Sequence, residues 1–289
     1  MTPRGRAVAY GAVTIVNAIS CGLGAALGID LQTEASVRLT NEPGKIEGRI
    51  LSDPNESIIL IQKTVSRVLR HFNLEEEYGA YVETRSNIPV ARGLKSSSAA
   101  ANAVALAVLD ALNEDISDLE VIGLGVDAAI EAGVTVTGAF DDACASYFGN
   151  VVITDNMERK ILRQFIPEEG YIVLVYVPER KSYTATSDIK RMKIIASQVK
   201  AIHKLALQGD YWTAMTVNGF LYAAALGYDP KIPLDALEAG AIAAGLSGKG
   251  PSVAAVVPHE NVSSVKEALR KYDGKIIESK INREKAHAV

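Results

Sequence analysis

Residues 88–100 combine the residue types of a phosphate-binding loop. A strand and a proline lead into a glycine turn, a lysine and three serines follow, and an alanine-rich helix begins. The first amides of a helix lack partners within it, and its dipole places partial positive charge there, so this segment can hold phosphate oxygens. The residues assigned to this phosphate site are Pro89, Val90, Ala91, Arg92, Gly93, Leu94, Lys95, Ser96, Ser97, Ser98 and Ala99.

The three serines have a simpler interpretation, because serine is a good helix cap. A cap needs one hydroxyl, so the run of three favours the phosphate site. The chain contains no GxxxxGK[ST] loop of the P-loop type, since Gly248 and Lys249 are followed by Gly250.

Two adjacent carboxylates, Asp141 and Asp142, lie among small and apolar residues at 138–149. Burying both charges without partners is unfavourable, so at least one should be paired or should act in chemistry. Neighbouring residues point in different directions along a helix or strand, so we expect only one of them to face a site. The alternative is that the pair caps a turn at 143–147.

A second glycine-rich loop, residues 245–252, precedes an apolar strand. Its glycines allow a backbone to approach a ligand closely, although the same composition also makes ordinary turns. Because it would be the second anion-binding loop in the chain, Gly248 and Gly250 are assigned to the same site.

The elements around these loops predict an α+β fold. In the first half, extended patterns occupy 8–17, 32–40, 48–51, 79–86 and 149–154, and helical patterns occupy 56–72, 96–112 and 118–132. In the second half, strands are expected at 170–177, 252–257 and 274–281, and helices at 187–207, 210–226, 233–244 and 260–271. The polar stretch 155–169 suggests a boundary near residue 155, between an N-terminal domain (1–155) and a C-terminal domain (156–289).

Composition excludes several classes of protein. The 289 residues are 48% hydrophobic and 22% charged, a balance that excludes disorder, collagen and coiled coil. The net charge of −4, without a run of basic residues, argues against a nucleic-acid partner. The two cysteines and four histidines have no zinc-site spacing, so we expect a cytoplasmic protein without zinc.

Residues 7–29 carry no charge and superficially resemble a signal peptide or a membrane span. Four glycines, several polar residues and a β-branched run favour a buried strand followed by a glycine-rich turn. We therefore expect no membrane partner.

The three segments together resemble the GHMP kinases, a family of small-molecule kinases that includes galactokinase, homoserine kinase and mevalonate kinase. The pattern at 89–99 resembles their phosphate loop, 138–150 resembles the segment that carries their catalytic aspartate, and 245–252 resembles their C-terminal glycine motif. The resemblance covers essentially the whole chain and implies a two-domain α+β fold with mixed and antiparallel sheets, unlike a P-loop fold.

The resemblance also implies roles for individual residues. Asp141 would be the catalytic base, ATP the phosphate donor, and Ser97 and Glu131 the ligands of Mg²⁺. Lys95 stands where most relatives carry Gly or Ser, and Gly11-Ala12 replaces the Gly-Lys or Gly-Arg of many relatives. Our hypothesis is that Lys95 supplies the missing positive charge beside the β- and γ-phosphates.

Within the family, residues 14–19 and 93–103 look most like the archaeal-type shikimate kinases. This branch implies phosphate transfer to the 3-hydroxyl of shikimate, a small carboxylate with three hydroxyls, by a monomer or small homo-oligomer. Its site requires a cation and hydrogen-bond partners, for which the candidates are Asn17, Ser20, Arg180, Lys181 and Thr184. The alternatives are a kinase for homoserine or a mevalonate-pathway alcohol, and a non-catalytic binding module.

Overall fold

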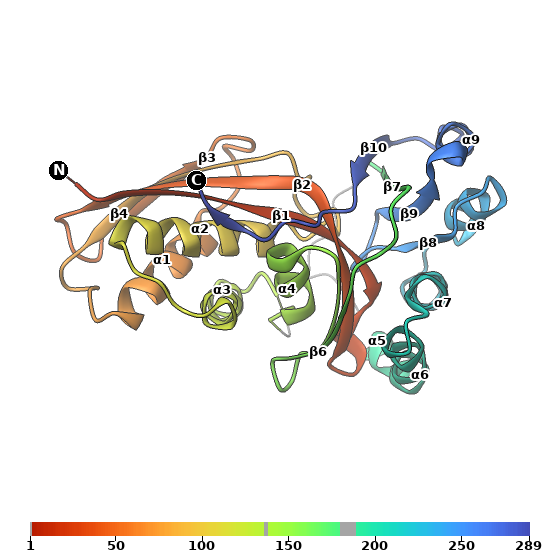
Figure 1. The fold of residues 1–289 in the computed structure, drawn as a ribbon, viewed down its shortest axis with the longest axis horizontal. Helices are drawn as coiled ribbons and strands as arrows, with labels where there is room; N and C mark the ends of the chain where they lie inside the picture. Colours follow the sequence, from red (N-terminus) through yellow and green to blue (C-terminus); the bar gives the residue numbers. More distant parts are fainter. Residues whose placement is uncertain (1, 136–137, 180–188) are drawn as a thin grey trace.

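The computed structural model describes residues 2–135, 138–179 and 189–289. In these ranges the chain forms two sheets with helices packed against them (Figure 1). The first has seven strands: five follow the path β11-β1-β2-β4-β3, β5 pairs with β2, and β6 pairs with β5. The second has four strands in the order β10-β7-β9-β8. The predicted α+β fold class is confirmed.

The first sheet is built around a long antiparallel hairpin. β1 (Arg4–Val16) and β2 (Leu23–Thr40) pair along most of their length and are joined by a short 3-10 turn, Ala18–Ser20. The remaining strands are β3 (Ile46–Ile50), β4 (Gly79–Ser86), β5 (Val151–Asp155), β6 (Lys160–Phe165) and β11 (His287–Ala288). Within this sheet β3 and β4 are parallel, and the other pairs are antiparallel.

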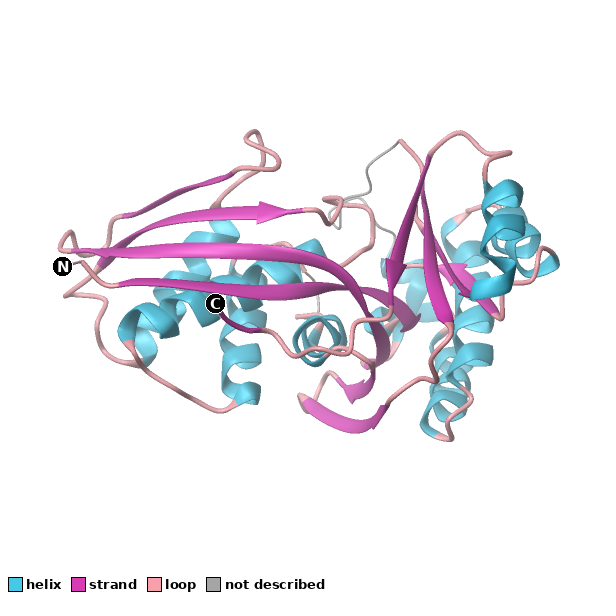
Figure 2. Cartoon of the chain, turned by 45° about the horizontal axis from the view of Figure 1, so that its top comes forward, coloured by secondary structure: helices cyan, strands magenta, loops and turns pink. Residues whose placement is uncertain are grey.

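Helices α1 (Ile59–His71) and α2 (Ser96–Leu112) cover one face of this sheet, and α3 (Asp118–Glu131) packs against both of them, so that helices gather on this face (Figure 2). Helix α2 lies against β1 and β2, and its alanines are buried, as predicted from its lack of a polar face. The small side chains let the helix approach the sheet closely. A fourth helix, α4 (Phe140–Phe148), packs against α2, α3 and the hairpin.

The second sheet is covered on both faces, because both faces of its central strand β7 (Tyr171–Val177) are apolar. One face packs on α6 (Ala196–Leu207) and α7 (Tyr211–Leu226), which also contact the hairpin of the first sheet. The other packs on α8 (Lys231–Glu238) and α9 (Val262–Leu269). The remaining elements are α5 (Ile189–Ile194), β8 (Ala243–Leu246), β9 (Val253–Pro258) and β10 (Lys275–Lys280).

Two predicted helices are wrong in extent. The helix expected at 233–244 begins and ends earlier as α8, because the chain turns at Gly240 with a φ of 106°, and Ala243–Leu246 is strand β8. Short alanine-rich runs do not distinguish a helix from a buried strand. The helix expected at 187–207 is two helices, α5 and α6, separated at Ile195, and residues 187–188 lie outside the described ranges.

Two strands also differ from expectation. β2 begins at Leu23 rather than near residue 32, so most of the segment predicted as a glycine-rich turn is strand. The polar stretch 155–169 contains β6, which pairs with β5 in the first sheet. All of β6 is at least partly exposed, so its sequence lacks the alternation that reveals a half-buried strand.

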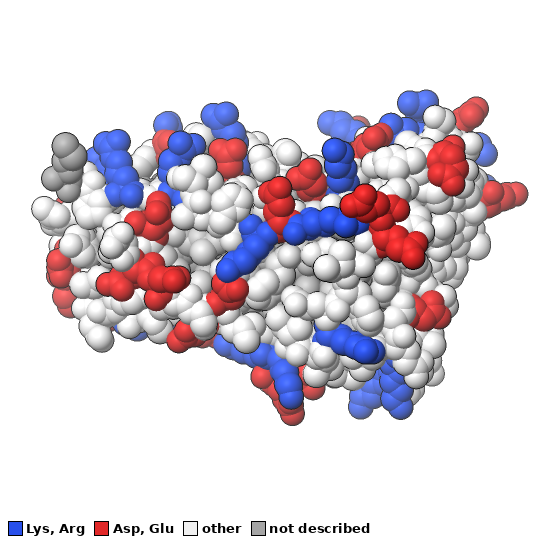
Figure 3. Space-filling model, viewed as in Figure 1, with Lys and Arg blue, Asp and Glu red and all other residues white. Residues whose placement is uncertain are grey.

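Residues 7–29 occupy β1 and the start of β2 in the core, as expected for a buried strand. Among the described helices, none has the length and apolar character needed to cross a bilayer. Acidic and basic side chains are interspersed over the face seen in Figure 3, without an extended patch of basic residues on that face.

Helix α7 and strand β8 touch backbone to backbone at Gly219, where an added Cβ would lie 2.3 Å from Gly245 Cα. We expect Gly219→Ala to lower the free energy of unfolding by about 1–3 kcal/mol, because the helix would have to move off the sheet. Gly123 is a matched control: it is also helical, with no atom within 4 Å of an added Cβ. Gly123→Ala should stabilise the protein by up to about 1 kcal/mol. Urea titration measures both, and equal destabilisation by the two substitutions would show that the contact between α7 and β8 does not require glycine.

Candidate active site

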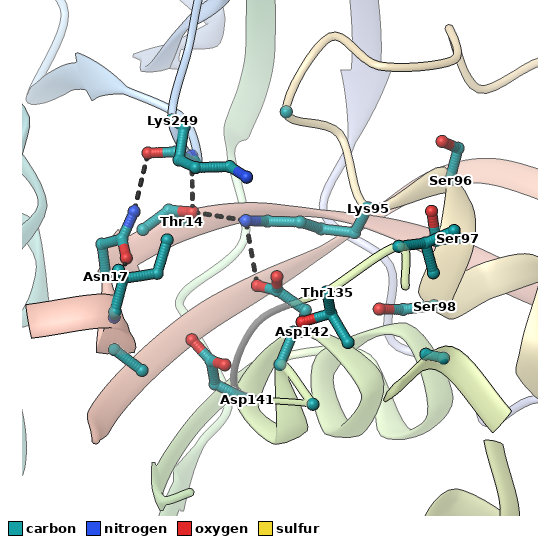
Figure 4. Close-up of a pocket in the computed structure, with 18 of the residues that line it drawn as sticks. Thr14, Asn17, Lys95, Ser96, Ser97, Ser98, Thr135, Asp141, Asp142 and Lys249 are labelled. Atoms are coloured by element: carbon teal, nitrogen blue, oxygen red, sulfur yellow. Dashed lines mark hydrogen bonds and ion pairs between the residues drawn. The ribbon is translucent and has the colours of Figure 1, made fainter. Parts of the chain in front are cut away.

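A pocket of about 960 Å³, open to solvent, lies where the hairpin of the first sheet meets the loop between β8 and β9 of the second. Figure 4 shows most of its polar side chains pointing into one space. The lining residues are Thr14, Asn17, Ala18, Ile19, Ala91, Gly93, Lys95, Ser96, Ser97, Ser98, Ala129, Val134, Thr135, Gly138, Ala139, Asp141, Asp142, Gly248, Lys249 and Gly250.

The start of helix α2 forms one wall of the pocket. Lys95 precedes the helix in the left-handed conformation, with a φ of 64°, and this turns the chain so that Ser96, Ser97 and Ser98 line the cavity. The amides of this first turn have no acceptor within the helix. Free amides, three hydroxyls and the dipole of a 17-residue helix therefore face the same space and favour an anion there.

The second glycine-rich loop is tied directly to the first and to the hairpin. The Ser247 hydroxyl donates to the Gly93 carbonyl at 2.7 Å, and the Gly248 amide donates to Thr14 Oγ1 at 2.8 Å. The Asn17 side-chain amide donates to the Gly248 carbonyl at 2.7 Å. An added Cβ at Gly93 would lie 2.3 Å from the Ser247 carbonyl oxygen, so this approach requires glycine.

Lys95 crosses the pocket and joins these parts. Its ammonium donates to Thr14 Oγ1 at 2.7 Å and forms an ion pair with Asp142 Oδ1 at 2.9 Å. The side chains of Lys95 and Asp142 are only 7% and 16% exposed, so the pair is well shielded from water. The prediction that only one of the two adjacent aspartates faces the site is wrong, because both lie in the first turn of α4 and line the pocket.

Asp141 is buried, with 4% of its surface exposed, and is held by Asn156. Its backbone amide donates to Asn156 Oδ1 at 3.1 Å, and Asn156 Nδ2 donates back to its carboxylate at 2.7 Å. Burial and the neighbouring Asp142 charge raise its pKa to about 7, although Lys95 and the Asn156 hydrogen bond oppose the rise. A carboxylate with this pKa can accept a proton near neutral pH.

Lys249 is a second pocket cation, half-buried on the glycine loop between Gly248 and Gly250. Burial is the main reason that its pKa is lowered to about 8, and the nearby charge of Lys95 adds to the decrease.

The predicted site residues are only partly brought together. Those that line the pocket are Asn17, Ala91, Gly93, Lys95, Ser96, Ser97, Ser98, Asp141, Gly248 and Gly250. Asn17 does so with both side-chain polar atoms engaged, since its oxygen accepts from the Ile19 amide. Arg180, Lys181 and Thr184 lie outside the described residues.

Other predicted residues do not line the pocket. These are Pro89, Val90, Arg92, Leu94, Ala99, Ser20 and Glu131. Leu94 and Ala99 are buried in the core, and Arg92 turns away to the carbonyls of Pro178 and Glu179. In a loop that binds phosphate, only some residues face the ligand, and their neighbours support the loop. Assigning every residue from 89 to 99 to the site therefore includes residues that do not line the pocket.

Glu131 ends helix α3 close to the pocket residues Ala129 and Val134. Its carboxylate forms ion pairs with Arg67 and, at 3.9 Å, with Lys63, both on α1. The structure thus does not bring Glu131 together with Ser97. In the described ranges, no three or more His, Cys, Asp or Glu residues are grouped so that they could hold a metal ion.

Sequence reasoning missed several polar residues at or behind the site, namely Thr14, Thr135, Asn156 and Lys249. Two of them carried a local signal. Thr14 is a hydroxyl within an apolar strand, and Lys249 is the cation of a glycine loop. Asn156 comes directly after β5 and meets Asp141 at the start of α4, 15 residues earlier in the chain, so no local pattern reveals this contact.

Comparison with protein families matches residues 60–150 to the GHMP kinases N terminal domain and residues 234–275 to the GHMP kinases C terminal domain. A shikimate kinase of Methanosarcina mazei is 49% identical over 284 residues, which cover 98% of this chain and 96% of that protein. A shikimate kinase of Methanothermobacter thermautotrophicus is 42% identical over 279 residues, which cover 95% and 94%.

Solved structures of similar fold include a homoserine kinase from Cytophaga hutchinsonii, with a TM-score of 0.77, 17% identity and coverage of 100% of this chain and 98% of that one. The Methanococcus jannaschii mevalonate kinase has a TM-score of 0.76 and 20% identity, with 98% of both chains covered. At these identities the likeness bears on the fold alone.

The raised pKa of Asp141 makes a prediction about stability. A carboxyl group whose pKa is higher in the folded protein binds its proton more tightly there than in the unfolded chain. For Asp141 the free energy of unfolding should therefore decrease as the pH rises from about 4, the ordinary pKa, to about 7, the pKa in the folded protein. Asp141→Asn retains an oxygen for Asn156 and removes the buried charge. We expect it to stabilise the protein at pH 8 by on the order of 1–3 kcal/mol, with little effect at pH 4.

Thermal unfolding at the two pH values measures this effect. Asp142→Asn is the matched control and should be destabilising at pH 8, because it leaves the shielded Lys95 ammonium without its carboxylate. A melting temperature of Asp141→Asn at or below that of the unaltered protein at pH 8 would refute the assignment of a buried, unfavourable charge.

Proposed function

The chain belongs to the GHMP kinase family, and from this premise we propose that it transfers the γ-phosphate of ATP to the 3-hydroxyl of shikimate, giving shikimate 3-phosphate and ADP. The kinase chemistry is supported by one observation above all: a buried aspartate with a pKa of about 7 shares a pocket with the start of helix α2. The choice of shikimate is supported by relatives that are 42–49% identical over nearly the full chain.

The proposed nucleotide site is the wall formed by the pocket-lining residues of 91–98, together with Gly248 and Gly250 of the second glycine-rich loop. The backbone amides of the first turn of α2 would bind phosphate oxygens, and the serine hydroxyls would add hydrogen bonds. Lys95 contributes positive charge next to this turn and at the same time fixes Asp142 and Thr14. The site therefore stabilises negative charge largely with groups that are already in place, which is the main requirement of phosphoryl transfer.

Asp141 is proposed as the base. Its carboxylate is oriented by Asn156, whose own oxygen accepts from the Thr154 hydroxyl at 2.7 Å. Asn156 engages Oδ1, so the second carboxylate oxygen, Oδ2, is the one proposed to meet the substrate in the pocket that Asp141 lines. It would accept the proton of the acceptor hydroxyl as that oxygen attacks the γ-phosphorus.

The residues present fit a magnesium ion that arrives with ATP, because Mg²⁺ takes much of its coordination from phosphate oxygens and water and needs few protein ligands. Ser97 is the proposed hydroxyl ligand, and the ion would neutralise phosphate charge there. Glu131 can be a second ligand only if its carboxylate leaves Arg67, with which it is paired in this structure.

Substrate identity is tested with a coupled ADP-release assay containing Mg-ATP and shikimate, homoserine or mevalonate. We expect turnover with shikimate and at least tenfold lower kcat/KM with the other two alcohols, because a pocket built for one pattern of hydroxyls leaves polar groups unpaired with another. Turnover with homoserine or mevalonate in place of shikimate would refute the substrate and keep the kinase. No turnover with any of them would favour a binding module.

The base is tested by Asp141→Asn. We expect kcat to fall by about 10²- to 10⁴-fold with little change in the KM for ATP, since the substitution removes the proton acceptor and retains the bond to Asn156. The matched control is Asp155→Asn, an acidic residue on the adjacent strand β5 that does not line the pocket. Equal activity of Asp141→Asn and the unaltered enzyme would rule out the role of Asp141.

A further inference from the structure

Lys249 has no role in the mechanism so far, although it lines the pocket together with Asp141. Its loop is fixed by both backbone groups of the preceding residue: the Gly248 amide donates to Thr14, and the Gly248 carbonyl accepts from Asn17. The backbone that carries the lysine is therefore held firmly against the hairpin, and the side chain projects into the pocket (Figure 4).

The charges of the pocket are not balanced around Lys249. Lys95 is paired with Asp142, but no carboxylate in the described ranges forms an ion pair with Lys249. A half-buried ammonium beside a second ammonium is unfavourable unless an anion joins it. In agreement, burial and the charge of Lys95 lower the pKa of Lys249 to about 8, although the Asp142 charge opposes this decrease. Such a site is complete only when a negatively charged ligand is present.

The position of Lys249 distinguishes two sources for that anion. The phosphate wall, formed by Ser96, Ser97 and Ser98, lies on the far side of Lys95 from Lys249 in Figure 4. The backbone next to Lys249 lies instead against Thr14 and Asn17, from the end of the hairpin, because both of these residues bond to Gly248. Lys95 reaches the hairpin side as well, where its ammonium donates to Thr14, but it is already paired with Asp142, and Lys249 is the other lysine among the described lining residues.

We propose that Lys249 binds the carboxylate of the acceptor substrate and so restricts the enzyme to anionic alcohols. The proposal rests on the proposed function, in which the acceptor is a small hydroxy acid. An acceptor held at its carboxylate by Lys249 presents its hydroxyls toward the rest of the pocket, where Asp141 takes the proton. Lys249 is thus a specificity-determining residue, with Asp141 as the base.

The test compares shikimate with shikimamide, in which a neutral amide replaces the carboxylate. The unaltered enzyme should prefer the acid by about 10- to 100-fold in kcat/KM, the range expected for one charged hydrogen bond. In Lys249→Met this preference should fall to within about threefold of unity, while kcat/KM for the amide and the KM for ATP stay near those of the unaltered enzyme. Lys249→Arg should keep a preference for the acid.

The amide serves as an internal control, because its continued turnover establishes that Lys249→Met is folded and binds ATP. Lys271→Met, at an exposed lysine, should leave every parameter unchanged. Two outcomes overturn the proposal: an undiminished preference for the acid in Lys249→Met, or a rise in the KM for ATP of tenfold or more with the preference intact, which would assign Lys249 to phosphate. If the unaltered enzyme does not phosphorylate shikimate, the proposed substrate is refuted. The role of Lys249 is then tested in the same way with homoserine and its amide in place of shikimate and shikimamide.

Discussion

Burial of two adjacent carboxylates in the first turn of helix α4 is the constraint on which the site depends. Asp142 is balanced by Lys95, and Lys95 is in turn fixed by Thr14 of the hairpin. Among the described residues no cation forms an ion pair with Asp141, which is held by an amide, Asn156. The two residues therefore differ in what they can do: Asp142 is paired with a cation and holds the site together, and Asp141 has its pKa raised to about 7. Two acidic residues with such different surroundings can serve a reaction in which one carboxylate accepts a proton next to a negatively charged phosphate.

Close backbone approaches make this burial possible. Gly24 of β2 lies directly over Asp141, and an added Cβ there would lie 2.5 Å from Asp141 Oδ2. Gly28 of the same strand lies against the end of α4, with an added Cβ 2.6 Å from Gly149 Cα. Because these glycines of β2 have no side chains, α4 can pack directly against the backbone of the strand. The strand remains regular at the glycines because it pairs with β1 and β5.

The sequence alone allowed us to predict those pocket-lining residues that lie next to one another in the chain. The glycine turn, the lysine and the serines before α2 lie within one loop, and Asp141 stands out by its apolar neighbours. It was insufficient where a role depends on a partner far along the chain. The family resemblance assigned Glu131 to magnesium, whereas its carboxylate is paired with Arg67 of α1. Ser20 was assigned to substrate, although it is buried outside the pocket. In the fold, the amphipathic and alanine-rich helices were predicted well, but an exposed strand such as β6 and a four-residue alanine-rich strand such as β8 lack a periodic signal.

Strand β11, at the end of the sequence, pairs with β1, at its beginning, so the first sheet is completed by the last residues. Residues 287–288 pair with β1 at the edge of the first sheet, the Ala286 amide donates to the Tyr147 carbonyl at 2.7 Å, and the Val289 amide donates to the Arg6 carbonyl at 2.9 Å. During synthesis the outer edge of β1 consequently stays unpaired until the whole second sheet has been made. An open strand edge can pair with other chains. The first sheet is thus begun early in synthesis but completed only when β11 has been made. Until then, the unpaired edge of β1 in the nascent chain must be kept from pairing with other chains.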